Sequence, residues 1–550
     1  MLYNRKVLDR WPVDTALNNR LKQAITPKPL PPSLAVAAPA FDYIVIGAGS
    51  AGCAVVASLL TVPYVSILLV EAGQENEVPE IQGYTQAMNL RGTIYDWNDQ
   101  SQPQTCMDGQ KMPYDAGKVD GGSSSINGMI WVRGNPADYD GWAALGNPGW
   151  DYPSVLPVFK RQEQWAGAGS PYRGEAGPIY ITKELTTNPV SVDFLKAITK
   201  MGYQANDDYN AATQYGVAFS QVNAKPVPAP VYGIRQDSFN AFVTDSIYKN
   251  PQLTVSNQTM VTKITFDSQR NVSQVILAIN GEIIPVTCLR ETILCAGALR
   301  SPQMLMLSGI GPAAALKQLG IPVLVDSPGV GQNLQDQLIS FVVHPLAKID
   351  PDHFSPMCNN IFTNGAPGAP QTGAPDYEVQ TFYMKNNPGF PPNQYAVGSI
   401  ALHPLSRGAI TLSSANYTDP PLIQPNLLCD PQDVQTSLKG LKMVREIANY
   451  FEANSDWLSP ETMPGPDVTT DQQLIAYMDE SSVPDFHYVG TCKMGPDSDS
   501  MAVVDPRLRV KGVNNLRVAD GSIMPRVISG NTNACSNMIG GRCGDFILQG

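Results

Sequence analysis

Histidine and charged side chains are both scarce in this chain of 550 residues. Charged residues make up 16%, against roughly 25% in an average globular protein. The nine cysteines include no CxxC pair, which disfavours a zinc module or a disulfide scaffold and leaves room for a single bridge. None of the four histidines stands at metal-ligand spacing, so we expect no metal centre. They are His344, His353, His403 and His487.

Basic residues are outnumbered by acidic ones, and the formal net charge is −12. Such a surface repels phosphate backbones, so we expect no nucleic-acid partner. The longest uncharged stretch, residues 43–70, contains three glycines and a proline, so it predicts a strand, a helix and a strand rather than a transmembrane segment. Residues 1–40 are basic and lack the apolar core of a signal peptide, and we expect an N-terminal extension there. The compartment is not readable from the sequence.

A strand, a glycine-rich turn, a helix and a second buried strand follow one another in residues 41–71. Gly47 permits the tight turn, Gly49 lets the backbone approach a pyrophosphate, and Gly52 lets the helix lie close to the strand. The helix N-terminus offers free N–H groups to phosphates, and Glu71 can accept from both ribose hydroxyls. This pattern predicts an adenine dinucleotide with a free ribose, and it does not separate FAD from NAD.

Four further stretches carry motifs in a fixed order along the chain. Together with the N-terminal turn they resemble the glucose–methanol–choline (GMC) oxidoreductases, a family of FAD flavoenzymes, from about Phe41 to Leu548. The stretches are Tyr95-Asp-Trp97 with residues 117–134; residues 295–312; His403-Pro-Leu-Ser-Arg-Gly408 with Asp419-Pro-Pro and Asp430-Pro431; and residues 487–495 with 518–525 and 529–534.

The resemblance implies FAD as the cofactor. Some members link the flavin to a histidine at the place of Ile126, so we expect FAD to be bound non-covalently here. Asp120 departs from the family, in which an apolar residue is usual. The residues expected to contact FAD are Gly47, Gly49, Ser50, Ala51, Gly52, Glu71, Ala72, Trp97, Gly122, Ser123, Asn127, Gly128, Met129, Ile130, Val261, Asp520, Gly521, Asn531 and Thr532.

Flavin-dependent alcohol oxidation needs a base, a carbon held near flavin N5, and a group that holds the developing alkoxide. His487 resembles the family's catalytic histidine, and its ordinary pKa suits a base. Asn531 resembles the partner position, where it would orient the substrate oxygen; Asn533 takes that place if the alignment slips by two. The other histidines are expected to be structural.

The fold class expected is α/β (α+β overall), with a Rossmann-like FAD-binding domain and a smaller substrate domain built on an antiparallel sheet. Alternating residues 377–384, 395–402 and 409–413 predict strands of that sheet. The expected segments are the extension 1–40, the first part of the FAD-binding domain 41–343 with room for a substrate-domain insertion around 135–225, the substrate domain 344–490, and the return of the FAD-binding domain 491–550.

The expected function is oxidation of a primary alcohol to the aldehyde by base-assisted hydride transfer to flavin N5. Oxygen or a quinone would then reoxidise the flavin. A hydroxynitrile lyase, a sugar oxidase or dehydrogenase on the same fold, and a non-catalytic flavin-binding protein are the alternatives. Three sequons, at Asn257, Asn271 and Asn416, would accept glycans only in a secreted protein.

Overall fold

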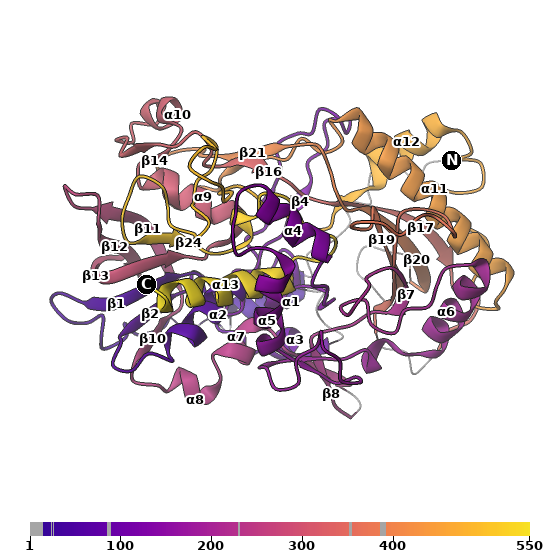
Figure 1. The fold of residues 1–550 in the computed structure, drawn as a ribbon, viewed down its shortest axis with the longest axis horizontal. Helices are drawn as coiled ribbons and strands as arrows, with labels where there is room; N and C mark the ends of the chain where they lie inside the picture. The colour runs from indigo at the N-terminus through magenta and orange to yellow at the C-terminus, as the bar shows by residue number, and fades with distance from the viewer. Residues whose placement is uncertain are drawn as a thin grey trace.

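Two large sheets, which lie side by side in Figure 1, organise the chain. The computed structural model describes residues 15–23, 25, 27–84, 90–228, 231–350, 355–384 and 392–550.

The first sheet has seven strands in the order β10-β2-β1-β13-β12-β11, with β24 also paired to β13. β10, β2, β1, β13 and β24 run parallel, while β11 and β12 form an antiparallel extension. All four residues of β2 are buried, as expected for a parallel strand covered on both faces. The strands are β1 (Ala40–Ile46), β2 (Ile67–Val70), β10 (Leu253–Ser256), β11 (Thr259–Phe266), β12 (Val272–Ile279), β13 (Glu282–Leu294) and β24 (Leu516–Val518).

Helices from opposite ends of the sequence pack together on this sheet. Helix α2 (Ser50–Leu59) follows β1, and α13 (Asn533–Leu548) lies directly against it. A Cβ at Gly540 of α13 would stand 2.2 Å from the carbonyl oxygen of Ala51, so only glycine allows this approach. The contact brings the N-termini of both helices together, because Ser50 Oγ donates a 2.7 Å hydrogen bond to Asn533 Oδ1.

The second sheet is antiparallel and has the strand order β23-β17-β20-β19-β18-β7. Helices α11, α6 and α12 lie beside it in Figure 1. Its elements are β7 (Gly216–Phe219), β17 (Leu338–Pro345), β18 (Met357–Thr363), β19 (Tyr377–Met384), β20 (Gln394–Ala401), β23 (Val483–Pro484), α6 (Pro189–Met201), α11 (Pro431–Ala453) and α12 (Asp471–Ser481).

The Rossmann-like sheet and the antiparallel sheet confirm the expected fold class, but one strand was assigned to the wrong sheet. β21 (Gly408–Thr411) does not continue from β20 and pairs instead with β16 (Gln332–Leu334) and β22 (Leu422–Gln424). The main chain turns away at Leu405 and Ser406, whose N–H groups both donate to the carboxylate of Asp433. The domain limits stay a prediction. Strand β17 runs across the expected boundary at 343/344. Strand β7, from the 135–225 region, belongs to the same antiparallel sheet as β17.

A single disulfide joins Cys106 to Cys429 across a sequence separation of 323. Cys106 lies in the loop between β3 (Asp99–Gln100) and β4 (Pro113–Tyr114), and Cys429 precedes α11. The remaining elements are α1 (Thr15–Gln23), α3 (Pro79–Gln82), η3 (Gly122–Ser125), α4 (Pro136–Ala144), α5 (Tyr152–Gln162), β5 (Glu163–Trp165), β6 (Ile179–Ile181), η4 (Glu184–Thr186), β8 (Ala224–Pro226), β9 (Gly233–Arg235), α7 (Ser238–Phe242), α8 (Asp245–Tyr248), α9 (Gly297–Leu307), β14 (Ile310–Gly311), α10 (Ala313–Gln318), β15 (Val325–Asp326) and η5 (Gly521–Ile523).

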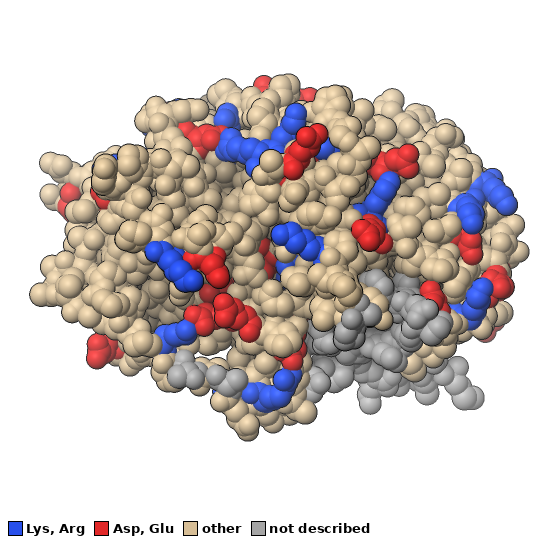
Figure 2. Space-filling view, turned by 90° about the horizontal axis from the view of Figure 1, so that it is seen from below, with Lys and Arg blue, Asp and Glu red and all other residues tan. Residues whose placement is uncertain are grey.

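Charges of both signs are mixed on the surface. On the face shown in Figure 2, Lys and Arg side chains lie close to Asp and Glu side chains, and most of the surface is uncharged. Among the described residues, no helix combines the length and the apolar character needed to cross a bilayer. Within the same residues, no group of three or more His, Cys, Asp or Glu side chains could hold a metal ion.

Candidate active site

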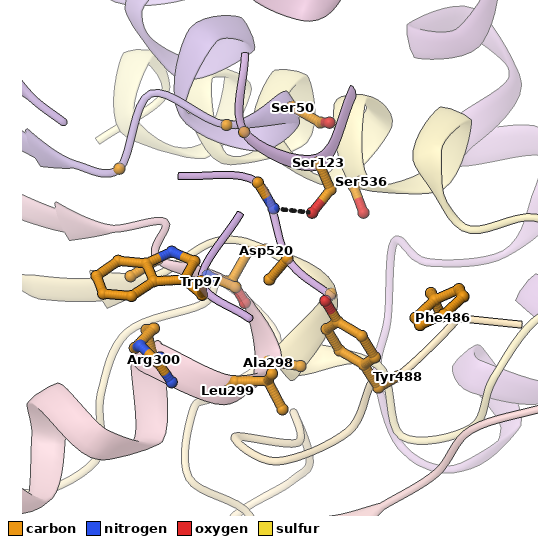
Figure 3. Close-up of a pocket in the computed structure, with 18 of the residues that line it drawn as sticks. Ser50, Trp97, Ser123, Ala298, Leu299, Arg300, Phe486, Tyr488, Asp520 and Ser536 are labelled. Carbon is orange, nitrogen blue, oxygen red and sulfur yellow. Dashed lines mark hydrogen bonds between the residues drawn. The ribbon is translucent and has the colours of Figure 1, made fainter. Parts of the chain in front are cut away.

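A cavity of about 360 Å³ runs from Glu71 beside the first sheet to His487 at the edge of the second. Figure 3 shows Trp97 and Arg300 on one side of it, and Phe486 and Tyr488 on the other. Every residue expected to contact FAD lines this cavity except Gly52. A Cβ at Gly52 would stand 2.0 Å from the carbonyl oxygen of Gly47, so this glycine lies where the helix packs against the turn.

Two glycine turns form the wall of the cavity at the nucleotide end. Gly47 has a φ of +102°, and a Cβ there would stand 2.5 Å from the carbonyl oxygen of Cys295. Gly122 has a φ of +54°, and a Cβ there would meet Cα of Gly49 at 2.8 Å. Side chains are therefore excluded from both turns, which leaves bare backbone beside the cavity, as a pyrophosphate requires.

Glu71 is held in place by the backbone of the same turns. Its Oε2 accepts from Ala48 N at 3.0 Å, and its Oε1 accepts from Gly73 N at 2.8 Å. Burial raises the pKa of this carboxyl to about 7 despite those hydrogen bonds. The carboxyl lines the cavity at the end of β2, where the ribose of a dinucleotide is expected.

Asp120, the departure from the family pattern, is buried next to this end of the site. Its Oδ1 accepts a 2.6 Å hydrogen bond from Asn257 Nδ2. Burial and the nearby Glu71 raise the pKa of Asp120 well above its usual value. Asn257 therefore provides the polar partner that this acid needs. Its own amide is buried in that contact, so the sequon at Asn257 is not presented to solvent.

Two cations lie over the Trp97 ring. The guanidinium carbon of Arg300 lies 4.3 Å from its ring centroid and Lys118 Nζ lies 4.6 Å from it. Arg300 is held by two hydrogen bonds to Asp99, of 2.9 and 2.8 Å. Arg300 lies in the motif stretch 295–312 but was not expected at the site from the sequence, because only the fold brings it to Trp97.

His487 and Asn531 meet at the other end of the cavity. Asn531 Nδ2 lies 3.0 Å from His487 Nε2, and His487 Nδ1 lies 2.7 Å from Gln337 Oε1. Asn533 does not reach the histidine, because its carboxamide bonds Ser50 at the nucleotide end. The structure thus brings together the two side chains assigned to catalysis, and Asn531 rather than the alternative Asn533 contacts the imidazole.

Gln337, which sequence reasoning missed, determines which ring nitrogen carries the proton. Its Nε2 donates to the carbonyl oxygens of Leu402 (2.8 Å) and Ile528 (2.9 Å), so its Oε1 must face His487 and accept. Nδ1 of His487 is then the donor, and Nε2 is bare and accepts from Asn531. Burial lowers the pKa of His487 to about 3, so the imidazole is neutral at ordinary pH.

The backbone around His487 is fixed by an antiparallel contact with residues 335–337. Val489 N donates to Gln335 O at 2.9 Å, and His487 N donates to Asp336 Oδ1 at the same distance. Asn531 lies in the turn before α13, where Ser529 N and Oγ both donate to Asp138 at 2.8 Å. Each side chain of the pair is thus held by a separate, buried hydrogen-bonded segment.

Further side chains at this end were not expected from the sequence. Three of them come from strands β18 and β19 of the antiparallel sheet, and no local sequence signal marks them, since strand patterns do not show which face meets a ligand. The residues that line this end besides the expected ones are Arg91, Met357, Gln380, Phe382, Asp485, Phe486 and Tyr488.

Comparisons with known proteins agree with this geometry. Residues 41–339 match one family profile and residues 404–540 match another, and both are described as GMC oxidoreductase. The mitochondrial choline dehydrogenase of Homo sapiens is 33% identical over 540 residues, with 92% of this chain and 89% of that protein covered. An alcohol dehydrogenase [acceptor] of Pseudomonas putida is 35% identical over 546 residues, with 92% and 96% covered.

A solved structure extends the comparison to the cofactor. A formate oxidase variant of Aspergillus oryzae, studied for its FAD modification, superimposes with a TM-score of 0.83 at 25% identity, covering 92% of this chain and 98% of that one. The cavity fits such a group, because bare glycine backbone lies at one end and a bare imidazole nitrogen at the other. The comparisons support FAD as the cofactor.

Proposed function

The chain belongs to the GMC oxidoreductase family and acts on CH–OH donors, and on that premise we propose that it oxidises a primary alcohol to the aldehyde with His487 as the base. The observation that carries the proposal is the unprotonated Nε2 of a neutral imidazole, which lines the cavity and accepts a 3.0 Å hydrogen bond from the Asn531 carboxamide. Where a substrate hydroxyl takes the place of that donor, Nε2 can accept the hydroxyl proton while the carboxamide holds the substrate oxygen.

Residues at one end of the cavity would bind the cofactor, and residues at the other end would act on the substrate. Gly47, Gly49, Gly122 and the helix N-terminus at Ser50 would hold the pyrophosphate, and Glu71 the ribose. FAD, when bound, supplies the hydride acceptor. His487 Nε2 takes the hydroxyl proton, and Asn531 orients the substrate oxygen by a hydrogen bond. His487 itself is buried.

We propose that FAD is bound without a covalent link. Ile126, which stands where some relatives carry a linking histidine, lines the cavity and offers no nucleophile. Precipitation of the purified yellow protein with acid is expected to leave free FAD in the supernatant, measured by absorbance and fluorescence. Flavin that stays with the washed pellet would contradict the proposal and require an attachment residue to be located by mass spectrometry.

The function is tested by anaerobic titration of the oxidised enzyme with a panel of primary alcohols, including choline. Bleaching of the flavin absorbance together with release of the aldehyde is the expected result. A hydroxynitrile lyase would turn over its substrate without net bleaching, and a sugar oxidoreductase would be bleached by sugars alone. Reoxidation of the bleached enzyme by oxygen or by a quinone analogue then identifies the electron acceptor.

A further inference from the structure

Asp485 lies at the end of the cavity that holds His487 and Asn531, called the reaction end below. Its carboxyl has no role in the fold or in the chemistry proposed above. It stands two residues before the base and lines the same cavity. Its Oδ2 lies 3.3 Å from His487 Nδ1, and among the described residues it is the one carboxylate within 4.0 Å of a His487 ring nitrogen. This oxygen is buried, and no side chain or backbone group of the described chain makes a hydrogen bond to it.

The two neighbouring acids each accept hydrogen bonds on one oxygen. Asp336, from the segment before β17, accepts on Oδ1 from the backbone N–H groups of Gln337 and His487. Glu378 of β19 accepts on Oε1 from the Asn360 and Gln380 carboxamides. The second oxygen of each is also buried without a hydrogen-bond partner in the described chain, but of the three acids only Asp485 has a carboxylate oxygen within 4.0 Å of a His487 ring nitrogen.

One cation faces the same carboxyl. Arg91 lies over the Phe486 ring at 4.3 Å and is paired with Asp115 at 3.1 Å. Its charge lowers the pKa of Asp485, whereas burial, Glu378 and Asp336 raise it, and the raising effects are the larger. A carboxylate at this place is therefore most stable when a second cation forms beside it.

The base needs such a counter-charge. Burial alone makes His487 a weak proton acceptor, because the imidazolium would form in a site shielded from water. Gln337 accepts from Nδ1 at 2.7 Å and orients the ring, but a neutral carboxamide carries no charge to offset the cation. We propose, resting on the function proposed above, that Asp485 is a positioning residue whose carboxylate stabilises the imidazolium formed when His487 takes the substrate proton.

The step balances without any proton on Asp485. The O–H bond of the alcohol breaks, and its proton binds His487 Nε2. The carbinol C–H bond would break as a hydride, whose two electrons a bound oxidised FAD would accept, and the carbonyl bond would form. In the reactive form of the pair Asp485 is ionised, and it stays ionised through the step. Asp485 and His487 titrate as a coupled pair. A proton bound to either group at lower pH must therefore dissociate before His487 can accept the substrate proton.

The test compares Asp485→Asn and Asp485→Glu with Asp479→Asn, the same chemical change in a half-buried acid of α12 that does not line the cavity. Stopped-flow flavin reduction should be about 10- to 100-fold slower in Asp485→Asn, less than the ~10²–10⁴ expected for loss of the base itself. The half-saturating alcohol concentration should change little. Asp485→Glu should recover much of the rate, and Asp479→Asn should stay near the wild type.

The pH profile gives a second readout. The ionised carboxylate favours the protonated imidazole, so removing it should move the acid limb of the reduction rate to lower pH. The same shift should appear without substrate, in an NMR titration of His487 in ¹⁵N-histidine-labelled protein. The chain has four histidines, and the signal that disappears in His487→Gln is that of His487. An unchanged titration in Asp485→Asn would overturn the proposal. So would weaker alcohol binding at an unchanged limiting rate, or an equal loss in Asp479→Asn.

Failure of the proposed function looks different. If no alcohol bleaches the wild-type flavin, the alcohol-oxidase proposal is wrong, whatever Asp485 does. The NMR titration still decides whether Asp485 controls the charge of His487, because it needs no turnover.

Discussion

At the scale of single residues, the reaction end depends on an imidazole whose tautomer is fixed from both sides. Gln337 Oε1 accepts a hydrogen bond from Nδ1–H, and Asn531 donates one to Nε2. His487 and Asn531 were predicted from the sequence because each lies inside a motif. Gln337 was not, because its role depends on two carbonyl oxygens, those of Leu402 and Ile528, that only the fold brings together.

Replacement of His487 by alanine should leave FAD bound and slow flavin reduction by ~10²–10⁴-fold, the usual worth of a general base. The change removes the proton acceptor and leaves the glycine turns at the nucleotide end intact. The measurement is anaerobic stopped-flow absorbance, with the flavin-to-protein ratio as the control. Loss of flavin in the variant would show that the side chain is structural.

Asn531→Ala should cost less than His487→Ala, about 10²–10³-fold in the same rate, because it removes one oriented donor and leaves the base in place. The penalties should not multiply in the double variant, since both groups act on one substrate oxygen. A slower reaction in Asn531→Ala than in His487→Ala would mean that the base is misassigned. Independent, multiplying penalties would rule out the shared-oxygen geometry.

At the scale of elements, local patterns predicted the strands better than their partners. Residues 377–384 and the strand near 395–402 were found and pair as expected, in β19 and β20. The strand near 409–413 also exists but belongs to another sheet, because Asp433 binds the preceding turn and redirects the chain. Alternation shows that a strand is half-buried, and it does not show which neighbour buries it.

The contact between α2 and α13 can be tested with two helical glycines. Gly540→Ala should destabilise the protein by about 1–3 kcal/mol, because the added methyl would meet the Ala51 carbonyl at 2.2 Å. Gly141→Ala in α4 is the matched control: no atom lies within 4 Å of its Cβ position, so the change should stabilise by about 0.5–1 kcal/mol.

Chemical denaturation followed by tryptophan fluorescence measures both variants. Since α13 places Asn531 and Thr532 at the cavity, Gly540→Ala should also lower FAD affinity, and Gly141→Ala should not. Equal stability of the two variants would show that the helices can separate without penalty.

At the scale of the whole molecule, the pairing of the disulfide could not be predicted from the sequence. Nine scattered cysteines left room for one bridge but gave no means of choosing partners 323 positions apart. Intact-mass analysis after alkylation in denaturant should count seven thiols before reduction and nine after it. Replacing Cys106 and Cys429 by serine should lower the free energy of unfolding by about 2–5 kcal/mol. A count of nine thiols without reductant would show that the bridge does not form.

The bridge also divides the chain topologically. Residues 106 to 429 form a covalently closed ring, and the segments before and after it are two open tails. The turn at Gly47 lies in the first tail, whereas His487 and Asn531 lie in the second. The cofactor cavity is lined by both tails as well as by the ring, and no covalent bond outside the ring connects the two tails. A bound dinucleotide would contact both tails and hold them together. Removing it should therefore increase the mobility of the two tails before it increases that of the ring.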